Sequence, residues 1–190
     1  MKIILIGNKA QHGKDTFAQM LSEAFEAKDK NVFIIHFGDC VKYIAEKYYN
    51  WNGLKDESGR SILQYVGGTF RENDEHFWTD FVARLLKADY FDSCYDYVLI
   101  PDWRHQEEHS RMLETFNFED IITVNIQRYN EDGSPFINPA MLPSQLKHKS
   151  EIDLDGYVTQ YIIENHSLRE LRETANAFAE MIAEGEYEFL

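Results

Sequence analysis

The chain has 190 residues, enough for one domain whose core needs neither disulfides nor a metal ion, and too few for two average domains. Its 19 Lys and Arg stand against 33 Asp and Glu, so the formal net charge is −14 and the pI is about 4.8. This acidity argues against a nucleic-acid polymer or an anionic membrane as a partner, because binding to either depends on neutralising phosphates with basic side chains. With 44% apolar and 14% aromatic residues, the sequence predicts a folded, soluble protein.

Targeting and cysteine signals are weak. No apolar run approaches the roughly 20 residues that span a bilayer, and the polar residues after the first apolar run do not resemble a signal-peptide cleavage site. Cys40 and Cys94 are the only cysteines, with no CxxC pair and no histidine at ligand spacing. We therefore expect a cytoplasmic protein with two free thiols and no structural metal. The sequence leaves the oligomeric state open, a homodimer included.

Short apolar runs of strand length alternate along the chain with stretches of helical periodicity. This alternation predicts an α/β fold with a five-stranded parallel sheet flanked by helices. The apolar spacing in residues 17–25 and again in 168–182 predicts helices that face the core. The predicted strands are Ile3–Ile6, Val32–Phe37, Tyr97–Ile100, Ile121–Ile126 and Tyr157–Ile163.

Two longer segments interrupt this alternation. Residues 39–90 are unusually long for a connection, and their apolar spacing predicts an insertion of several helices. Residues 129–150 hold three of the four prolines and lack sustained periodicity, which predicts a mobile lid. We expect both segments to belong to one domain that spans residues 1–190.

The most informative motif lies between the first predicted strand and the first predicted helix. It follows the P-loop pattern G-x-x-x-x-G-K-[ST], in which backbone N–H groups and a helix N-terminus face phosphates while the lysine neutralises their charge. Gly13 and Lys14 match, whereas Asn8 replaces the first glycine and Asp15 replaces the Ser or Thr. The alternative is a plain turn into a helix with a solvated Lys14. A lysine in the first helical turn opposes the macrodipole, however, and a bound anion compensates for it. We therefore predict ATP binding by Asn8, Lys9, Ala10, Gln11, His12, Gly13, Lys14, Asp15 and Thr16.

Polar side chains also follow the other predicted strands. Ligands of open parallel sheets bind beyond the carboxyl ends of the strands. Asp102 follows the third strand and is expected to hold Mg²⁺ together with Thr16, or else to cap a helix. Arg104 is a candidate bidentate phosphate ligand, with a solvated surface arginine as the alternative. Arg128 begins the predicted lid and is expected to close over the transferred phosphate.

Several short motifs together resemble one enzyme family, the phage-type deoxynucleoside monophosphate kinases, from the N-terminus to about Leu171. The resemblance implies a P-loop NTPase fold like that of the adenylate kinases. It also implies transfer of the γ-phosphoryl group of ATP to a deoxynucleoside monophosphate with Mg²⁺, an acceptor-binding helical insertion and a mobile lid. The motifs are Gly13-Lys14-Asp15-Thr16, Phe37-Gly38-Asp39-Cys40-Val41-Lys42, Arg60 with Leu63-Gln64-Tyr65-Val66-Gly67, Phe77-Trp78, Asp102-Trp103-Arg104 with Glu107, His148-Lys149-Ser150-Glu151 and Asn165-His166-Ser167-Leu168.

The predicted site combines residues of these motifs with Arg71 and Arg128. We expect Lys14, Arg104 and Arg128 to be catalytic and Asn165 to contact the nucleotide. An amide can read a base edge and an aromatic ring can stack on a base, although a buried structural role is the alternative for both Gln64 and Trp78. The predicted acceptor site consists of Phe37, Asp39, Lys42, Arg60, Gln64, Arg71, Trp78, Arg104 and His148.

Two other functions are consistent with the sequence. The first is another small-molecule P-loop kinase, of the dephospho-coenzyme A or phosphomevalonate type. The second is a sensor that binds a mononucleotide without turnover, which Asn8 and Asp15 in the loop favour. The identity of the base cannot be read from the sequence, because related nucleotides differ in groups that only pocket geometry distinguishes.

Overall fold

A parallel sheet forms the centre of the computed structural model, which describes residues 1–54 and 56–185. Within these residues, five strands pair in the order β2-β3-β1-β4-β5, and every pairing is parallel. This confirms the predicted sheet. The strands are β1 (Lys2–Gly7), β2 (Val32–Ile34), β3 (Tyr97–Trp103), β4 (Ile121–Arg128) and β5 (Tyr161–Asn165).

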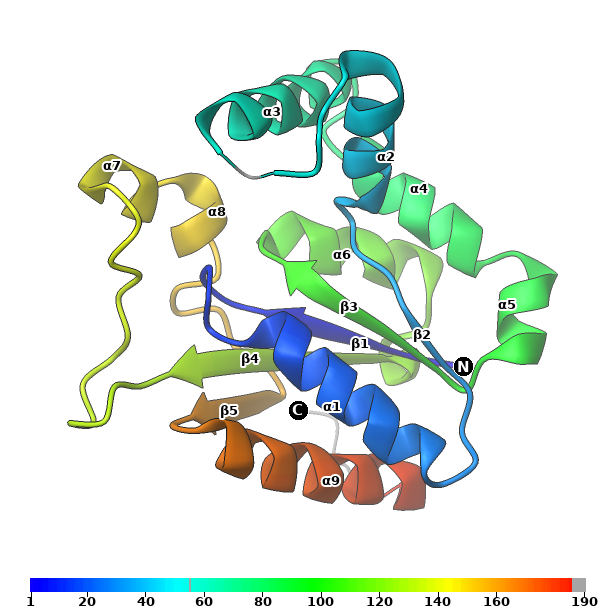
Figure 1. Ribbon diagram of the computed structural model, residues 1–190. Coiled ribbons are helices and arrows are strands. Elements are labelled where there is room, and N and C mark those ends of the chain that lie inside the picture. The colour runs from blue at the N-terminus through cyan, green and yellow to red at the C-terminus, as the bar shows by residue number, and fades with distance from the viewer. Residues whose placement is uncertain (55, 186–190) are drawn as a thin grey trace.

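Helices cover both faces of the sheet, which explains why its central strands are apolar throughout. In β1, Ile4 and Ile6 face one hydrophobic cluster while Ile3 and Leu5 face another, and all four are fully buried. Burying each such side chain stabilises the fold by about 1.5–3 kcal/mol. The first cluster is closed by α1 (Lys14–Glu26) and α9 (Leu168–Glu184), which lie side by side in front of the sheet (Figure 1).

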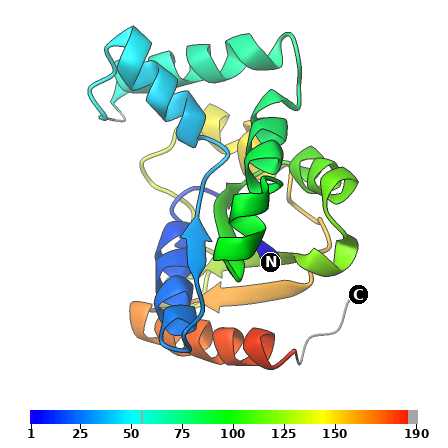
Figure 2. The ribbon, with the colours of Figure 1, turned by 90° about the vertical axis from the view of Figure 1, so that its right-hand side faces the viewer.

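The predicted helical insertion divides into two parts. Its helices are α2 (Asp39–Tyr49), α3 (Glu57–Arg71), α4 (Phe77–Leu86) and α5 (Asp89–Cys94). α2 and α3 pack against each other around Ala45, Trp51 and Val66, and Figure 2 shows this pair at the top, apart from the sheet. α4 instead contributes Val82 and Leu86 to the second cluster of the sheet. Among the described residues of the insertion, α2 and α3 therefore share a hydrophobic cluster that is separate from the sheet, whereas α4 packs on the sheet.

The predicted lid contains short helices that its sequence did not indicate. The connection between β4 and β5, residues 129–160, is called the β4–β5 segment below. It begins with an antiparallel bridge between Tyr129 and Pro135, and then forms α7 (Pro143–Leu146) and α8 (Lys149–Ile152). Helices of four residues are too short to show a periodic pattern. In Figure 1 this segment runs along the left side of the molecule, beside the loop that joins β1 to α1.

Some predicted boundaries were wrong. β2 ends at Ile34, because residues 36–39 form a turn whose Phe37 and Gly38 N–H groups bond to Asp102 instead of to a strand. β5 begins at Tyr161, since Tyr157 packs against the second cluster and bonds through its hydroxyl to His109.

The second helix-covered face also contains an element that the sequence did not predict, α6 (Gln106–Thr115). This mostly polar helix buries only Glu108 and Met112 among its described residues. A 3-10 turn, η1 (Phe118–Asp120), leads from it into β4. In the part of the chain that the structure describes, no helix is long and apolar enough to cross a membrane.

Gly7, at the end of β1, lies where the sheet packs closely against the β4–β5 segment. A β-carbon on Gly7 would lie 2.7 Å from Cε3 of Trp103 and 2.8 Å from Cδ1 of Leu154. We therefore expect Gly7→Ala to lower the free energy of unfolding by about 1–3 kcal/mol. Gly68 is the matched control, because nothing lies within 4 Å of its added β-carbon inside α3, and Gly68→Ala should raise stability by up to about 1 kcal/mol. Urea unfolding of both variants measures this, and equal effects would contradict the packing argument.

Candidate functional site

The loop between β1 and α1 has a backbone that requires unusual residues. Gly13 precedes α1 with φ 96°, and a β-carbon there would lie 2.5 Å from Nδ2 of Asn165, so glycine is needed. Asn8 has φ 127°, which side-chain-bearing residues rarely adopt. Its side chain compensates with hydrogen bonds: Nδ2 donates to Oδ1 of Asn125 (2.6 Å) and to the carbonyl of Ile126 (2.7 Å). Its Oδ1 also accepts from the N–H of Lys9 (2.7 Å).

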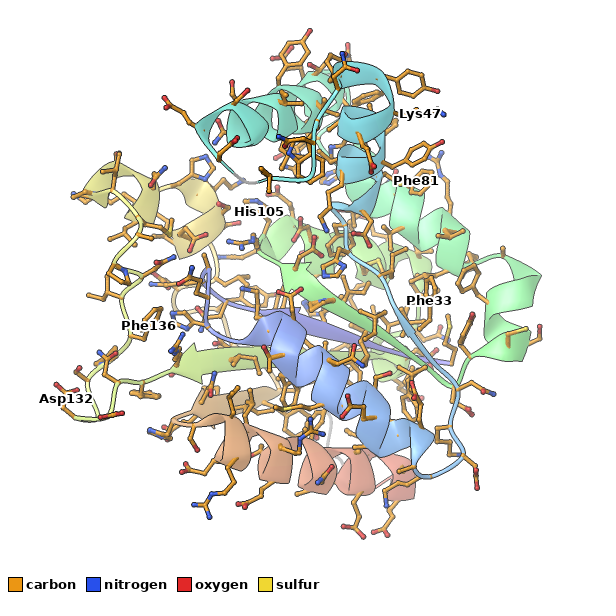
Figure 3. All side chains as sticks on the ribbon, viewed as in Figure 1. Phe33, Lys47, Phe81, His105, Asp132 and Phe136 are labelled. Carbon is orange, nitrogen blue, oxygen red and sulfur yellow. The ribbon has the colours of Figure 1, made fainter. Side chains whose placement is uncertain are left out.

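The ends of β4 and β5 also bond the loop between β1 and α1. Nδ2 of Asn165 donates to the carbonyl of His12 (2.9 Å), and the N–H of Arg128 donates to Nδ1 of His12 (3.2 Å). Burial lowers the pKa of His12, in keeping with a neutral ring that accepts this bond. The Arg128 guanidinium bonds the carbonyl of Gln11 and lies 4.2 Å from the ring centroid of Phe136. Figure 3 shows Phe136 on the β4–β5 segment. The guanidinium of Arg128 thus lies at the loop, whereas the buried Asn165 side chain supports the loop backbone at His12.

Lys14 is buried inside this loop, with only 5% of its surface exposed. Its Nζ donates to the carbonyls of Asn8 (2.8 Å) and Lys9 (2.6 Å). Burial, reinforced by the charge of Arg104, lowers the pKa of Lys14 to about 7. A phosphate placed beside the ammonium would favour its charged form.

A carboxylate lies between the loop and Arg104. Oε2 of Glu151, in α8, accepts from the N–H of Ala10 (2.8 Å), and Oε1 pairs with Nη1 of Arg104. The Glu151 side chain is only 6% exposed, and Nη1 of Arg104 also donates to the carbonyl of Ser150 (3.3 Å). Sequence reasoning missed this role for Glu151. The motif His148-Lys149-Ser150-Glu151 was its only signal, and it lay at the edge of the predicted lid.

Asp102 ties the end of β3 to the turn that follows β2. Its two carboxylate oxygens accept from the N–H groups of Phe37 (2.8 Å) and Gly38 (2.9 Å). Among the described residues, no group of three or more His, Cys, Asp or Glu side chains is placed to hold a metal ion. Magnesium in nucleotide sites usually binds through one or two protein groups, phosphates and waters, so the exposed Thr16 hydroxyl and the remaining lone pairs of Asp102 fit that ion.

A histidine that the sequence did not single out joins two carboxylates near this turn. Nε2 of His36 lies 2.8 Å from Oδ1 of Asp15, and its Nδ1 lies 3.2 Å from Oδ2 of Asp39. Nζ of Lys42 donates to the other oxygen of Asp39 (2.8 Å). Burial would lower the pKa of His36, but the hydrogen bonds to Asp15 and Asp39 outweigh it and raise the pKa to about 9. A cationic His36 therefore neutralises Asp15, the residue at the Ser or Thr position of the motif.

Glu108 bonds the turn that carries Arg104, and Arg71 acts on the same turn through its charge. Oε2 of Glu108 accepts from the N–H groups of Arg104 (2.9 Å) and His105 (3.1 Å), and burial raises the pKa of Glu108 to about 8. After burial, the charge of Arg71 also lowers the pKa of His105, so Arg71 acts on this turn electrostatically. Figure 3 shows His105 just beyond the end of β3. Glu108 thus fixes the backbone from which Arg104 reaches Glu151.

The remaining predicted acceptor residues do not all face one space. Phe37 (3% exposed) packs in the sheet core, and Trp78 (2% exposed) donates its indole N–H to the carbonyl of Gly67 (3.0 Å), which matches the buried alternative. Gln64 is exposed on α3, and His148 caps α8 by bonding Ser150. The side chain of Arg60 lies outside the described part of the structure.

The pairing of His36 predicts a pH dependence of stability. A pKa raised from 6.5 to about 9 contributes stability that is complete below pH 6.5 and is lost as the pH rises through about 9. We expect the loss to be on the order of 3 kcal/mol between pH 6 and pH 10. Urea unfolding of the wild type and of His36→Gln across this range measures the difference, since Lys14 and Glu108 titrate in both proteins. Parallel pH profiles for the two proteins would contradict the His36 assignment.

Comparison with known proteins agrees with this architecture. No protein-family model matches the sequence, and no curated protein matches it. Solved structures do match over nearly the whole chain. A gluconokinase from Sinorhizobium meliloti 1021 is 16% identical with a TM-score of 0.53, covering 97% of this chain and 94% of its own. A sugar kinase from Janibacter sp. HTCC2649 is 13% identical with a TM-score of 0.51, covering 95% of each chain.

A third match is the APS kinase CysC of Mycobacterium tuberculosis in complex with AMPPNP and APS. It is 11% identical with a TM-score of 0.50, covering 96% of this chain and 97% of its own. Because the identities are this low, the structural similarity shows only the fold: a parallel sheet, flanking helices and a loop after β1. The chain has the α/β fold of the P-loop kinases.

Proposed function

We propose that this protein is an ATP-dependent small-molecule kinase and that its acceptor is a deoxynucleoside monophosphate. One observation carries the proposal: the buried Lys14 loop lies beside a second cation, Arg104, whose guanidinium is already paired with an anionic group at the loop. Phosphoryl transfer needs two phosphates held in line and their charge stabilised, and little covalent help from the protein. Two adjacent anion-binding groups are the main requirement for that reaction.

The donor half of the proposed site is the loop. Lys14 would leave the carbonyls of Asn8 and Lys9 to bind the β- and γ-phosphates, while the loop N–H groups and the start of α1 bind their oxygens. Arg128 lies next to Gln11 and would reach the transferred group from the β4 side. Thr16 and Asp102 would hold Mg²⁺, which neutralises phosphate charge when bound.

The acceptor half would lie between Arg104 and the helices α2 and α3. Arg104 and Arg71 are the proposed ligands of the acceptor phosphate, because Arg104 is paired with a carboxylate at the loop and the charge of Arg71 acts on the neighbouring His105. Asp39 and Lys42, at the start of α2, form an ion pair that can bind sugar hydroxyls. The resemblance to deoxynucleoside monophosphate kinases supports this choice of acceptor.

A second candidate function is mononucleotide binding without transfer. Asp15 occupies the position of the Mg²⁺-binding hydroxyl and engages His36 at 2.8 Å, which favours this candidate. One experiment separates these functions. Purified protein is incubated with Mg-ATP and each deoxynucleoside monophosphate, or with gluconate or a nucleoside as an alternative acceptor, and ADP formation is measured. ADP formation only with monophosphates supports our proposal. ADP formation with gluconate would assign a sugar acid as the acceptor in place of a nucleotide. Measurable ADP binding without turnover supports the sensor.

Removing the loop cation tests the donor half. We expect Lys14→Ala to reduce the transfer rate by about 10²–10³-fold, the usual effect of losing one preorganised electrostatic donor. Lys28→Ala, an exposed lysine just beyond α1, is the control and should retain normal rates. Initial rates of ADP formation measure both variants, with unfolding curves to show that each is folded. Normal turnover in Lys14→Ala would refute the donor assignment.

Removing Arg71 tests the acceptor half. We expect Arg71→Ala to raise the KM for the monophosphate by about tenfold or more and to leave the KM for ATP unchanged, because a charged hydrogen bond contributes about 1.5–3 kcal/mol. Arg84→Ala is the control, since Arg84 is an exposed arginine on α4 that pairs with Asp80. A larger change in the ATP requirement would assign Arg71 to the donor side.

A further inference from the structure

We propose that Glu151 is a latch: its carboxylate holds donors that a substrate phosphate needs, so phosphate binding must displace it and release α8 from the loop. This inference rests on the proposed function, since it concerns regulation of the same site. The sequence assigned the loop N–H groups and Arg104 to phosphates, and Glu151 engages one of each. Each carboxylate oxygen thus serves a different half of the site.

The geometry makes Glu151 and a phosphate direct competitors. The N–H of Ala10 has one hydrogen, and Oε2 of Glu151 accepts it at 2.8 Å. A phosphate oxygen at that N–H would meet the carboxylate in a position that is almost closed to solvent, where like charges repel strongly. One anion must therefore leave before the other binds.

Contacts on both sides of Glu151 would keep α8 close to the site after release. Lys149 pairs with Glu107 at 2.9 Å, and Asp153 accepts from the N–H of Gln106 (3.2 Å). These partners belong to α6 and not to the loop. α8 has only four residues, so the side chain of Glu151 can swing away without unfolding a long element.

Release would also change the partner of Arg104. Its Nη1 is held by Glu151 and by the carbonyl of Ser150, which precedes Glu151 in the chain. When Glu151 leaves the loop, this guanidinium becomes available to the acceptor phosphate. Binding at the donor loop would thereby prepare the acceptor half, a coupling that neither half provides alone.

The test compares Glu151→Gln with Asp155→Asn. Gln keeps the shape and can still accept from Ala10, but it loses the charge that repels phosphate. Asp155 is the matched control, because it belongs to the same segment and pairs with Lys9 of the same loop at 3.0 Å, yet accepts no loop N–H. Isothermal titration with ADP and with inorganic tripolyphosphate measures affinity. We expect Glu151→Gln to bind both about tenfold more tightly than the wild type, and Asp155→Asn to stay within about twofold.

Unchanged or weaker binding by folded Glu151→Gln overturns the latch. If that variant does not fold, Glu151→Asp keeps the charge on a shorter side chain and should also bind more tightly, and failure to do so likewise overturns it. Hydrogen exchange gives a second readout: tripolyphosphate should speed exchange of the backbone amides in residues 149–153 of the wild type, and slower exchange there contradicts displacement. If the wild type turns over ATP but Glu151→Gln binds ADP and tripolyphosphate no more tightly than the wild type, the latch is refuted and the proposed function stands. No ADP binding by any variant refutes the proposed function as well.

Discussion

The hydrogen bonds from Asn8 to β4 hold the loop between β1 and α1 in a backbone conformation that few residues other than glycine adopt. Asn8 is strained at φ 127°, and the bonds of its amide to Asn125 and Ile126 offset the cost of that strain. Gly13 and Asn165 fix the other end of the loop against β5. The buried position of Lys14, and with it the proposed donor site, depends on this attachment to two neighbouring strands.

The proposed site brings several cations together in an acidic protein. The net charge is −14, yet Lys14, Arg104 and Arg128 gather at one edge of the sheet. Each of these cations bonds a carbonyl or carboxylate of the protein, which keeps it from facing a second cation unpaired. His36 adds a further positive charge where Asp15 would otherwise leave a negative one beside the loop. The cations of the proposed site are thus gathered locally although the molecule as a whole is acidic.

Local patterns predicted the sheet and the loop, because alternating apolar runs and the spacing of Gly13-Lys14 are properties of adjacent residues. The start of β5 and the polar helix α6 were not predicted, since both depend on packing between distant segments. His36 and Glu151 were missed for the same reason: Glu151 meets Ala10 across 141 positions of the chain. Neither side chain forms a recognisable motif with its partners, so only the folded structure reveals their roles.

The separate hydrophobic cluster of α2 and α3 has a consequence for how this architecture diversifies. Ala45, Trp51 and Val66 stabilise the helix pair without sharing contacts with the buried strands. Substitutions on this pair can therefore accumulate at little cost to the central sheet, and new surfaces can arise above an unchanged loop. A protein engineer could exchange the pair as a unit, grafting at the Asp102-anchored turn before α2 and at the junction with α4.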